Sequence, residues 1–185
     1  KEARRAFDFS DEELVLVSLG GFWEYKNYDY VVRAIAELPE AAEVLYVHIG
    51  KKGEKLQQEA EKHGVADKVR PMGFVDDVLP ILYASDVYVM PSSIEGFGIA
   101  AVEAMATGLP VILSDVPALR DFRRFTDDIY WVAPRITDLV EAIRHFRVLS
   151  EKKRKAIGER LHQAMKDRFT PRKGAQSYLE IYREQ

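Results

Sequence analysis

Two carboxylates stand eight positions apart in a stretch that otherwise favours a buried helix. Glu95 precedes the glycines of Gly96-Phe97-Gly98, and Glu103 lies among the alanines of residues 99–106. A helix that begins at glycines exposes unbonded backbone N–H groups and the positive end of its dipole, which suits a phosphate or a diphosphate. Glycine also lets such a ligand approach the backbone closely. The segment therefore predicts a phosphate site at the start of a helix.

Glu103 stands where it could hold the nucleoside of such a ligand. It follows Gly98 by five residues, which is about 7.5 Å along a helix that rises 1.5 Å per residue. A carboxylate at that distance from a diphosphate could accept hydrogen bonds from two ribose hydroxyls. Glu95 lies on the other side of the phosphates, where a polyhydroxyl sugar would fit it. The alternatives are that Glu103 faces solvent and that Glu95 only complements the helix dipole.

Six short apolar runs predict the sheet that would hold this segment. Their apolar residues are continuous rather than alternating, and helical patterns separate them, which is typical of a parallel sheet covered on both faces. We therefore predict an α/β fold: a Rossmann-like, doubly wound parallel sheet of about six strands in the order 3-2-1-4-5-6, with additional C-terminal helices. The strands are expected at residues 14–19, 44–49, 68–72, 87–90, 111–113 and 129–132.

The helices between and after these strands follow from apolar residues at helical spacing. Asn27 and Asp76 are the N-caps expected for the first and third of them, and Thr170 with Pro171 is the expected start of the last. The helices are expected at residues 28–38, 52–63, 76–83, 98–107, 119–125, 138–148, 151–168 and 171–183.

This strand order places the two most unusual loops of the chain together. In a doubly wound sheet the ligand crevice opens where the strand order reverses, here between the first and fourth strands. The loops that leave these strands are residues 20–27 and 92–98. The topology and the two carboxylates thus point to the same place.

The composition excludes several classes of protein. The 185 residues are 47% hydrophobic, enough for one domain with a sizeable core. A net charge of −3 argues against a dedicated nucleic-acid binder, and the absence of cysteine excludes disulfides and thiolate metal sites. No apolar run reaches the ~18 residues of a membrane span, and no signal peptide is visible. Because the chain begins at Lys1 rather than at methionine, we expect a fragment of a longer protein.

A basic segment lies near the C-terminal end. Residues 151–173 carry nine Lys or Arg against three Asp or Glu, and Ile157, Leu161 and Met165 form an apolar stripe through it. One interpretation is a docked helix with a solvated basic face. The other is a surface that faces a further domain or an anionic membrane.

At this point the residues resemble a known family. Their pattern is similar to the signature of the retaining GT-B glycosyltransferases of family GT4, in which the two glutamates form an E-x7-E motif. The resemblance covers the whole chain as a C-terminal, nucleotide-sugar-binding half. It rests on Gly73-Phe74-Val75, Ala84-Ser85-Asp86-Val87, Pro91-Ser92, Glu95-Gly96-Phe97-Gly98, Glu103-Ala104-Met105-Ala106, Gly108, Pro110-Val111 and residues 169–182.

The resemblance implies a role for each loop at the crevice. Lys26 would neutralise the diphosphate and Glu95 would hold the sugar, and these two are the catalytic residues that it implies. Glu103 would hold the ribose. Gly21 stands where the family commonly has an arginine, which leaves Lys26 as the basic side chain of the first loop. The remaining donor-binding residues would be Gly20, Gly21, Gly50, Lys51, Gly73, Phe74, Leu79, Gly96, Phe97, Gly98, Ile99 and Ala100.

The resemblance also implies an activity and a setting. It implies hexosyl transfer with retention of configuration, without a metal or a cofactor, and the chain contains no Asp-x-Asp motif. The donor would be a UDP-sugar, with a GDP-sugar as the alternative. Residues 1–185 would be the donor-binding domain alone, inactive without an N-terminal acceptor domain. The expected setting is cytoplasmic, with a peripheral contact of the full-length enzyme at the inner face of a membrane.

Two other functions remain open. Gly96-x-Gly98-x-x-Ala101 matches a dinucleotide fingerprint and Asp115 could hold a ribose, which would suit a nicotinamide dehydrogenase. Against this, the motif follows the fourth strand, and Glu95 would crowd the pyrophosphate. The second alternative is a non-catalytic domain that binds a nucleotide sugar without transferring it.

Overall fold

The strands of the chain form one parallel sheet whose order matches the prediction. The computed structural model describes residues 2–39, 42–166 and 168–169 of the chain. Its sheet runs β3-β2-β1-β4-β5-β6, which confirms the doubly wound topology. The strands are β1 Leu14–Leu19, β2 Val44–Ile49, β3 Val69–Gly73, β4 Val87–Met90, β5 Val111–Ser114 and β6 Tyr130–Val132.

The helices follow the expected spacing with local differences. A short helix precedes β1 and was not predicted, α3 begins two residues later than expected, and the helix expected at residues 119–125 divides into an α-helix and a 3-10 turn. The predicted final helix, residues 171–183, lies outside the described residues. The helices are α1 Glu2–Arg5, α2 Tyr28–Ala36, α3 Glu54–Lys62, α4 Leu79–Ala84, α5 Ile99–Ala106, α6 Pro117–Arg120, α7 Ile136–Val148 and α8 Glu151–Lys166, with 3-10 turns η1 Glu24–Lys26, η2 Ala66–Lys68 and η3 Asp121–Arg124.

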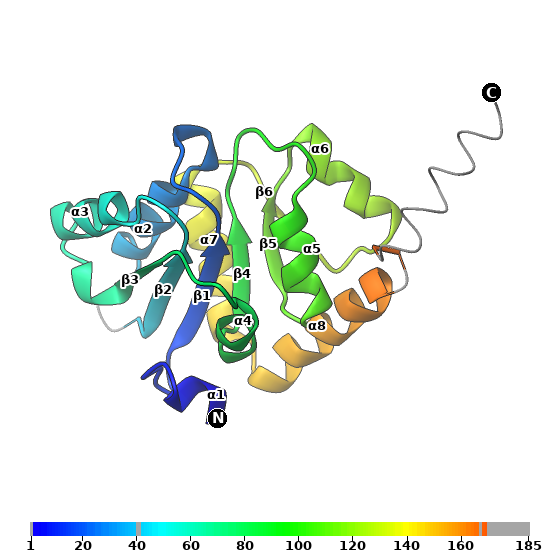
Figure 1. Cartoon of the computed structure of the whole chain (residues 1–185), viewed down its shortest axis with the longest axis horizontal. Coiled ribbons are helices and arrows are strands. Elements are labelled where there is room, and N and C mark those ends of the chain that lie inside the picture. Colours follow the sequence, from blue (N-terminus) through cyan, green and yellow to red (C-terminus); the bar gives the residue numbers. More distant parts are fainter. Residues whose placement is uncertain (1, 40–41, 167, 170–185) are drawn as a thin grey trace.

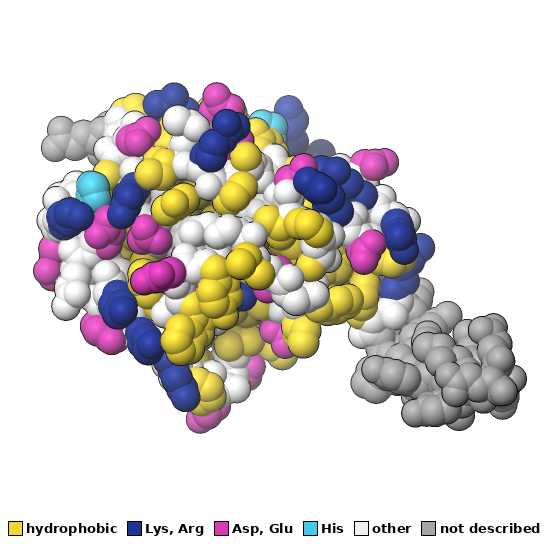
Figure 2. Space-filling view, turned by 90° about the horizontal axis from the view of Figure 1, so that it is seen from above, with side chains coloured by type: hydrophobic (Ala, Val, Ile, Leu, Met, Phe, Trp, Pro, Cys, Tyr) yellow, Lys and Arg dark blue, Asp and Glu magenta, His cyan; other side chains and the backbone are white. Residues whose placement is uncertain are grey.

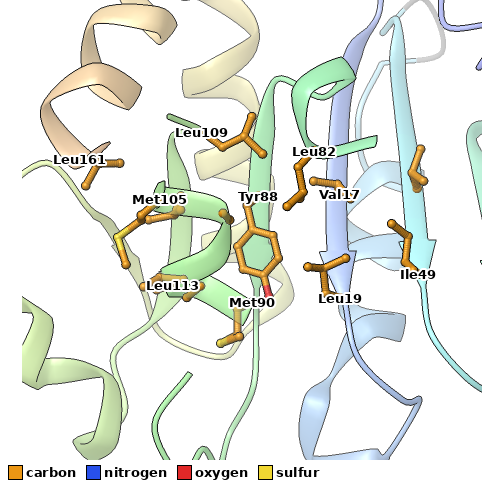
Figure 3. Close-up of a cluster of buried hydrophobic side chains, with 14 of the residues drawn as sticks. Val17, Leu19, Ile49, Leu82, Tyr88, Met90, Met105, Leu109, Leu113 and Leu161 are labelled. Atoms are coloured by element: carbon orange, nitrogen blue, oxygen red, sulfur yellow. The ribbon is translucent and has the colours of Figure 1, made fainter. Parts of the chain in front are cut away.

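Helices cover both faces of the sheet, as Figure 1 shows. One buried cluster joins the sheet to α4, α5 and α8, and the other joins it to α2, α3 and α7. Figure 3 shows part of the first cluster, in which Tyr88 and Met90 of β4 lie between side chains of β1 and of α5. Because both faces are buried, every residue of β1 and β2 is buried. This explains why the strands appear in the sequence as continuous apolar runs.

The neighbours of β1 bring the two important loops to one edge. β1 pairs in parallel with β2 on one side and with β4 on the other, with Leu19 opposite Ile49 and Val17 opposite Tyr88. The chain leaves all three strands at the same edge of the sheet, at the top of Figure 1. The loops after β1 and β4, which the sequence predicted to lie together, are in contact, since Ser93 N donates to the Tyr25 carbonyl at 2.8 Å.

Two expected helix caps are wrong in their chemistry. Asn27 does precede α2, but it adopts a left-handed conformation with φ 52° and its side chain makes no cap hydrogen bond. The side-chain amide of Asn27 donates instead to the carbonyl oxygen of Pro91, at 2.9 Å. The cap before α4 involves Asp77 rather than Asp76, since the Asp77 carboxylate accepts a hydrogen bond from the Leu79 amide at 3.0 Å.

At the opposite edge of the sheet, Asp86 ties together three distant segments. Its carboxylate accepts hydrogen bonds from the backbone amide of Val15 and from the Arg4 guanidinium, both at 2.8 Å. Arg154 of α8 contributes a third contact at 3.3 Å. The three side chains are only 11–16% exposed, so charge pairing rather than water must compensate their desolvation. This cluster fastens α1 and α8 to the start of β1.

Candidate functional site

A cleft of about 610 Å³ opens at the carboxyl edge of the sheet. Its walls are the loops after β1, β2 and β3, and one carboxylate from α5 closes it. The lining is mostly apolar, which suits a base and a ribose more than a free ion. The lining residues are Leu19, Gly20, Gly21, Phe22, Trp23, Ile49, Gly50, Lys51, Lys52, Phe74, Val75, Val78 and Glu103.

Close backbone contact joins the first two walls. The amide of Gly20 donates to the Ile49 carbonyl at 2.8 Å, and the amide of Phe22 donates to the Lys51 carbonyl at 3.0 Å. A Cβ atom on Gly50 would lie 1.8 Å from the Gly20 carbonyl oxygen, so any larger residue would force the loops apart. The Gly50 amide in turn donates to the Gly73 carbonyl at 2.8 Å. The floor of the cleft is therefore a bonded backbone surface.

Glu103 faces this cleft from α5 without a partner. It is exposed, and no hydrogen bond or ion pair within the described part of the chain involves its carboxylate. The packing around it is carried by Ala101, Ala104 and Met105, which are buried. A carboxylate that lines an apolar cleft and has free lone pairs can accept ligand hydroxyl groups.

The start of α5 offers unbonded donors close by. Gly98 adopts φ 83°, and a Cβ atom there would lie 2.6 Å from Leu119 Cδ2, so this position needs glycine. Among the described residues, the backbone N–H groups of residues 96–100 find no hydrogen-bond partner. Phe97 holds the loop by edge contacts with Phe122 and Phe169, with ring centroids 6.0 and 5.7 Å apart. This is an anion-binding geometry.

Lys26 and Glu95 touch each other directly. Lys26 Nζ lies 2.6 Å from Glu95 Oε1, and their side chains are 18% and 7% exposed. Ser92 Oγ donates to the same oxygen at 2.8 Å. The Asn27 amide and the hydrogen bond from Ser93 N to Tyr25 O, at 2.8 Å, hold the two loops together. The resemblance assigned Lys26 to the diphosphate and Glu95 to the sugar, and in the structure these two side chains form an ion pair.

A buried polar group supports the floor beneath Gly20. Tyr28 donates its phenol hydrogen to the Leu19 carbonyl at 2.8 Å, and its ring lies 4.6 Å from that of His48. Burial, followed by the negative charge of Glu95, raises the pKa of the Tyr28 phenol. Burial lowers the pKa of His48 to about 4, so the ring is neutral near pH 7. His48 Nδ1 shares a hydrogen bond of 2.8 Å with Ser18 Oγ. These groups are structural.

The structure groups some predicted site residues and separates others. Gly20, Gly21, Gly50, Lys51, Phe74 and Glu103 line the cleft together, as expected. Leu79 does not line it, and Val75 and Val78 take that place because α4 begins only at Leu79. Lys26, Glu95, Gly96, Phe97, Gly98, Ile99 and Ala100 stand outside this lining, at the β4–α5 loop and the η1 turn.

Seven lining residues were not predicted as site residues: Phe22, Trp23, Leu19, Ile49, Lys52, Val75 and Val78. A signal existed for the first two, since large aromatic residues directly after a strand-ending glycine pair are unusual in a solvated loop. Lys52 carried no signal, because it was expected inside a helix.

Two negative findings bear on other sites. Within the described ranges, no group of three His, Asp or Glu side chains comes together as a set of metal ligands. No helix in the same part of the chain is long and apolar enough to cross a membrane.

Comparisons with known proteins identify relatives of the chain in sequence and in fold. The family described as "Glycosyl transferases group 1" matches residues 1–164. An uncharacterized glycosyltransferase of Methanocaldococcus jannaschii is 35% identical over 141 residues, or 74% of this chain and 36% of that protein. The O-antigen biosynthesis glycosyltransferase WclY of Escherichia coli is 27% identical over 184 residues, or 97% of this chain and 49% of that protein.

Solved structures share the fold. HepE of Anabaena, crystallised with UDP and glucose, superposes with a TM-score of 0.86 at 19% identity, covering 100% of this chain and 52% of HepE. The chain spans about half the length, or less, of these relatives. The likeness confirms the Rossmann-like GT-B architecture. With the family match over most of its length, the chain belongs to the group 1 glycosyl transferases.

Proposed function

We propose that this chain binds a nucleoside diphosphate sugar at the carboxyl edge of its sheet. In the whole protein, this domain and an acceptor-binding domain would transfer the sugar with retention of configuration and without a metal. The donor is a UDP-sugar, with a GDP-sugar as the alternative. One observation carries the proposal: the unpartnered carboxylate of Glu103 lines an apolar cleft beside the unbonded amides at the start of α5.

The parts of such a donor match the parts of the site. The base fits the apolar wall of Phe74, Val75 and Val78, and the ribose hydroxyls reach Glu103. The diphosphate lies along Gly20 and Gly21 towards the amides of residues 96–100, where the helix dipole favours an anion. The sugar then lies towards Glu95. HepE, whose structure contains UDP and glucose, has the same fold.

The chemistry that this arrangement supports is departure of a nucleoside diphosphate. The amides of α5 and the ammonium group of Lys26 stabilise negative charge that develops on the leaving phosphate oxygen. The ion pair holds Glu95 and Lys26 in place before the donor arrives, so little reorganisation is needed. Glu95 accepts hydrogen bonds from hydroxyl groups of the sugar and orients it.

The exposed surface around the cleft suits a second domain. Large exposed hydrophobic side chains gather on loops at the carboxyl edge: Trp23, Tyr25, Phe74, Ile94, Phe97 and Ile99. Figure 2 looks onto the molecule from this side and shows hydrophobic groups across the middle of the face. Apolar surface of this kind marks an interaction site. Closure of an acceptor domain over it would exclude water from the sugar.

A nicotinamide dehydrogenase fits the site less well. The acid proposed for its ribose, Asp115, is held by Arg120 at 2.7 Å and by Arg123 at 3.1 Å. The hydrogen bond from Arg120 is the main cause that lowers the pKa of Asp115. Glu103, by contrast, is free for a ribose.

Substitution of the two glutamates tests the donor assignment. Glu103→Gln is expected to weaken binding of the nucleoside, the nucleoside diphosphate and the nucleotide sugar alike, by about 1.5–3 kcal/mol, because a charge-assisted hydrogen bond to the ribose is lost. Glu95→Gln is expected to leave the affinity for the nucleoside unchanged and to lower the affinity for the nucleotide sugar. Titration calorimetry with uridine, UDP and UDP-glucose, and with the guanosine series, measures both effects, and EDTA tests the metal independence.

Glu61→Gln, at an exposed position of α3, is the matched control. If Glu95→Gln and Glu103→Gln change the affinities for all ligands equally, the assignment of the sugar to Glu95 and of the ribose to Glu103 is wrong. If no nucleotide binds the chain, the proposed function is wrong.

The isolated chain is expected to bind donor but to transfer little or no sugar. The described cleft supplies one wall of the reaction site, and all described strands belong to one sheet. A turnover assay would compare this chain with the full-length protein on the same donor and acceptor. Comparable rates would place the acceptor site within these residues and contradict the two-domain proposal.

A further inference from the structure

Trp23 and Lys52 form a pair at the mouth of the cleft. Lys52 Nζ lies 4.0 Å from the centroid of the Trp23 ring, close enough for a cation–π interaction. Both residues line the cleft, and the indole is 51% exposed. The ammonium group therefore sits on an aromatic platform that belongs to the cleft wall.

The indole places this cation beside the Gly20-Gly21 backbone. A Cβ atom on Gly21 would lie 3.0 Å from Trp23 Nε1. The indole thus fills the space into which a side chain at position 21 would project. Lys52, stacked on that indole, brings a positive charge to the region where Gly21 provides none.

The charge balance of the site indicates a use for this cation. Lys26 is paired with Glu95 at 2.6 Å, which offsets part of its charge, and Glu103 adds a negative charge to the cleft. Lys51 and Lys52 are the cations of the described lining, and neither has a carboxylate partner within the described residues. A diphosphate carries several negative charges, and an ammonium group without a carboxylate partner has all three of its N–H donors for them.

The backbone of Lys52 is also unusual. Its φ is 66°, in the left-handed region that side chains other than Asn and Asp seldom adopt. A strained conformation in a loop that lines a cleft points to a functional requirement. Lys52 lies in the turn between β2 and α3, and its ammonium group contacts the indole.

We propose that Lys52, positioned by Trp23, is a second phosphate-binding cation of the donor site. The inference rests on the proposed nucleotide-sugar site. The indole restricts the lysine side chain, which lowers the entropy lost when the ammonium group contacts a phosphate oxygen. Trp23 is a positioning residue, because it acts through Lys52.

The test compares ligands with and without phosphates. The wild-type chain and the variants Lys52→Gln, Lys52→Arg, Trp23→Leu and Lys55→Gln are titrated with UDP and uridine, or with GDP and guanosine if these bind more tightly. Lys52→Gln is expected to lower the affinity for the nucleoside diphosphate about tenfold or more and to leave the affinity for the nucleoside nearly unchanged. It should also reduce the salt dependence of diphosphate binding, whereas Lys52→Arg should retain affinity. Trp23→Leu should lower the affinity for the nucleoside diphosphate less than Lys52→Gln does.

Lys55→Gln is the matched control. Lys55 also stacks on an aromatic ring, that of Phe22 at 5.9 Å, but it does not line the cleft, so diphosphate binding should not change. Equal losses for diphosphate and nucleoside in Lys52→Gln would overturn the inference, and so would unchanged diphosphate affinity. Failure of the wild-type chain to bind any of these ligands would overturn the proposed function itself, a result distinct from failure of Lys52 alone.

Discussion

Replacing Lys26 by alanine is expected to weaken nucleoside diphosphate binding by about 2–5 kcal/mol, a loss of roughly 30-fold or more. The change removes a cation and also leaves Glu95, whose side chain is 7% exposed, without its partner at 2.6 Å. The uncompensated carboxylate would then repel the phosphates. The nucleoside, which carries no phosphate, should bind almost as before. Calorimetry with UDP and uridine measures the difference.

A double variant separates the two causes. Lys26→Ala combined with Glu95→Gln removes the repelling charge as well as the cation, so part of the UDP affinity should return. Lys55→Ala, which removes a lysine outside the cleft, should change neither ligand. Equal losses of UDP and uridine affinity in Lys26→Ala would contradict the assigned contact with the diphosphate.

Asp86→Ala is expected to lower the free energy of unfolding by about 3–5 kcal/mol. Removing one member of a buried ionic cluster leaves the other charges desolvated and unpaired. Here the variant removes the carboxylate of Asp86 from the guanidinium groups of Arg4 and Arg154, and the Asp11 carboxylate, 4.0 Å from Arg4, is half exposed. The Nε atom of each arginine is already buried without a hydrogen-bond partner. The amide of Val15 also loses its acceptor. Urea unfolding followed by circular dichroism measures the loss.

The control is an exposed ion pair of similar geometry. Asp128 accepts hydrogen bonds from both Nε and Nη2 of Arg160, which is 55% exposed, so Asp128→Ala should cost only about 0–1 kcal/mol. If Asp86→Ala costs no more than Asp128→Ala, the cluster does not hold α1 and α8 to the sheet as described.

The strands were predicted well because each strand of a buried parallel sheet is visible in the sequence as a short apolar run. Strands buried on both faces require continuous apolar runs, and those runs at residues 14–19 and 44–49 coincide with β1 and β2. The right-handed connection rule then leaves few possible strand orders. The prediction chose the order 3-2-1-4-5-6 because it is the common doubly wound arrangement, and the sheet has this order.

Helix ends were predicted less well because several signals compete there. Asn27 has the composition of an N-cap, yet its amide bonds to Pro91, 64 residues away. Lys52 and Gly53 have helical neighbours, yet they form the turn before α3. Residue propensities describe only sequence neighbours, so they do not predict such long-range partners.

The sequence by itself determined the fold class, the position of Glu103 on α5 and the glycine-rich loops of the cleft, since each depends on periodicity or on residue type within a short window. The strand order was predicted by analogy with other doubly wound sheets, because no local pattern records it. The tertiary structure alone decided which side chains meet. Lys26 and Glu95 are 69 residues apart, and Arg4 and Asp86 are 82 apart. Trp23 meets Lys52 only because the β1 and β2 loops are bonded through Phe22 and Lys51. Such contacts depend on where the sheet delivers each loop, and no local pattern in the chain encodes that position.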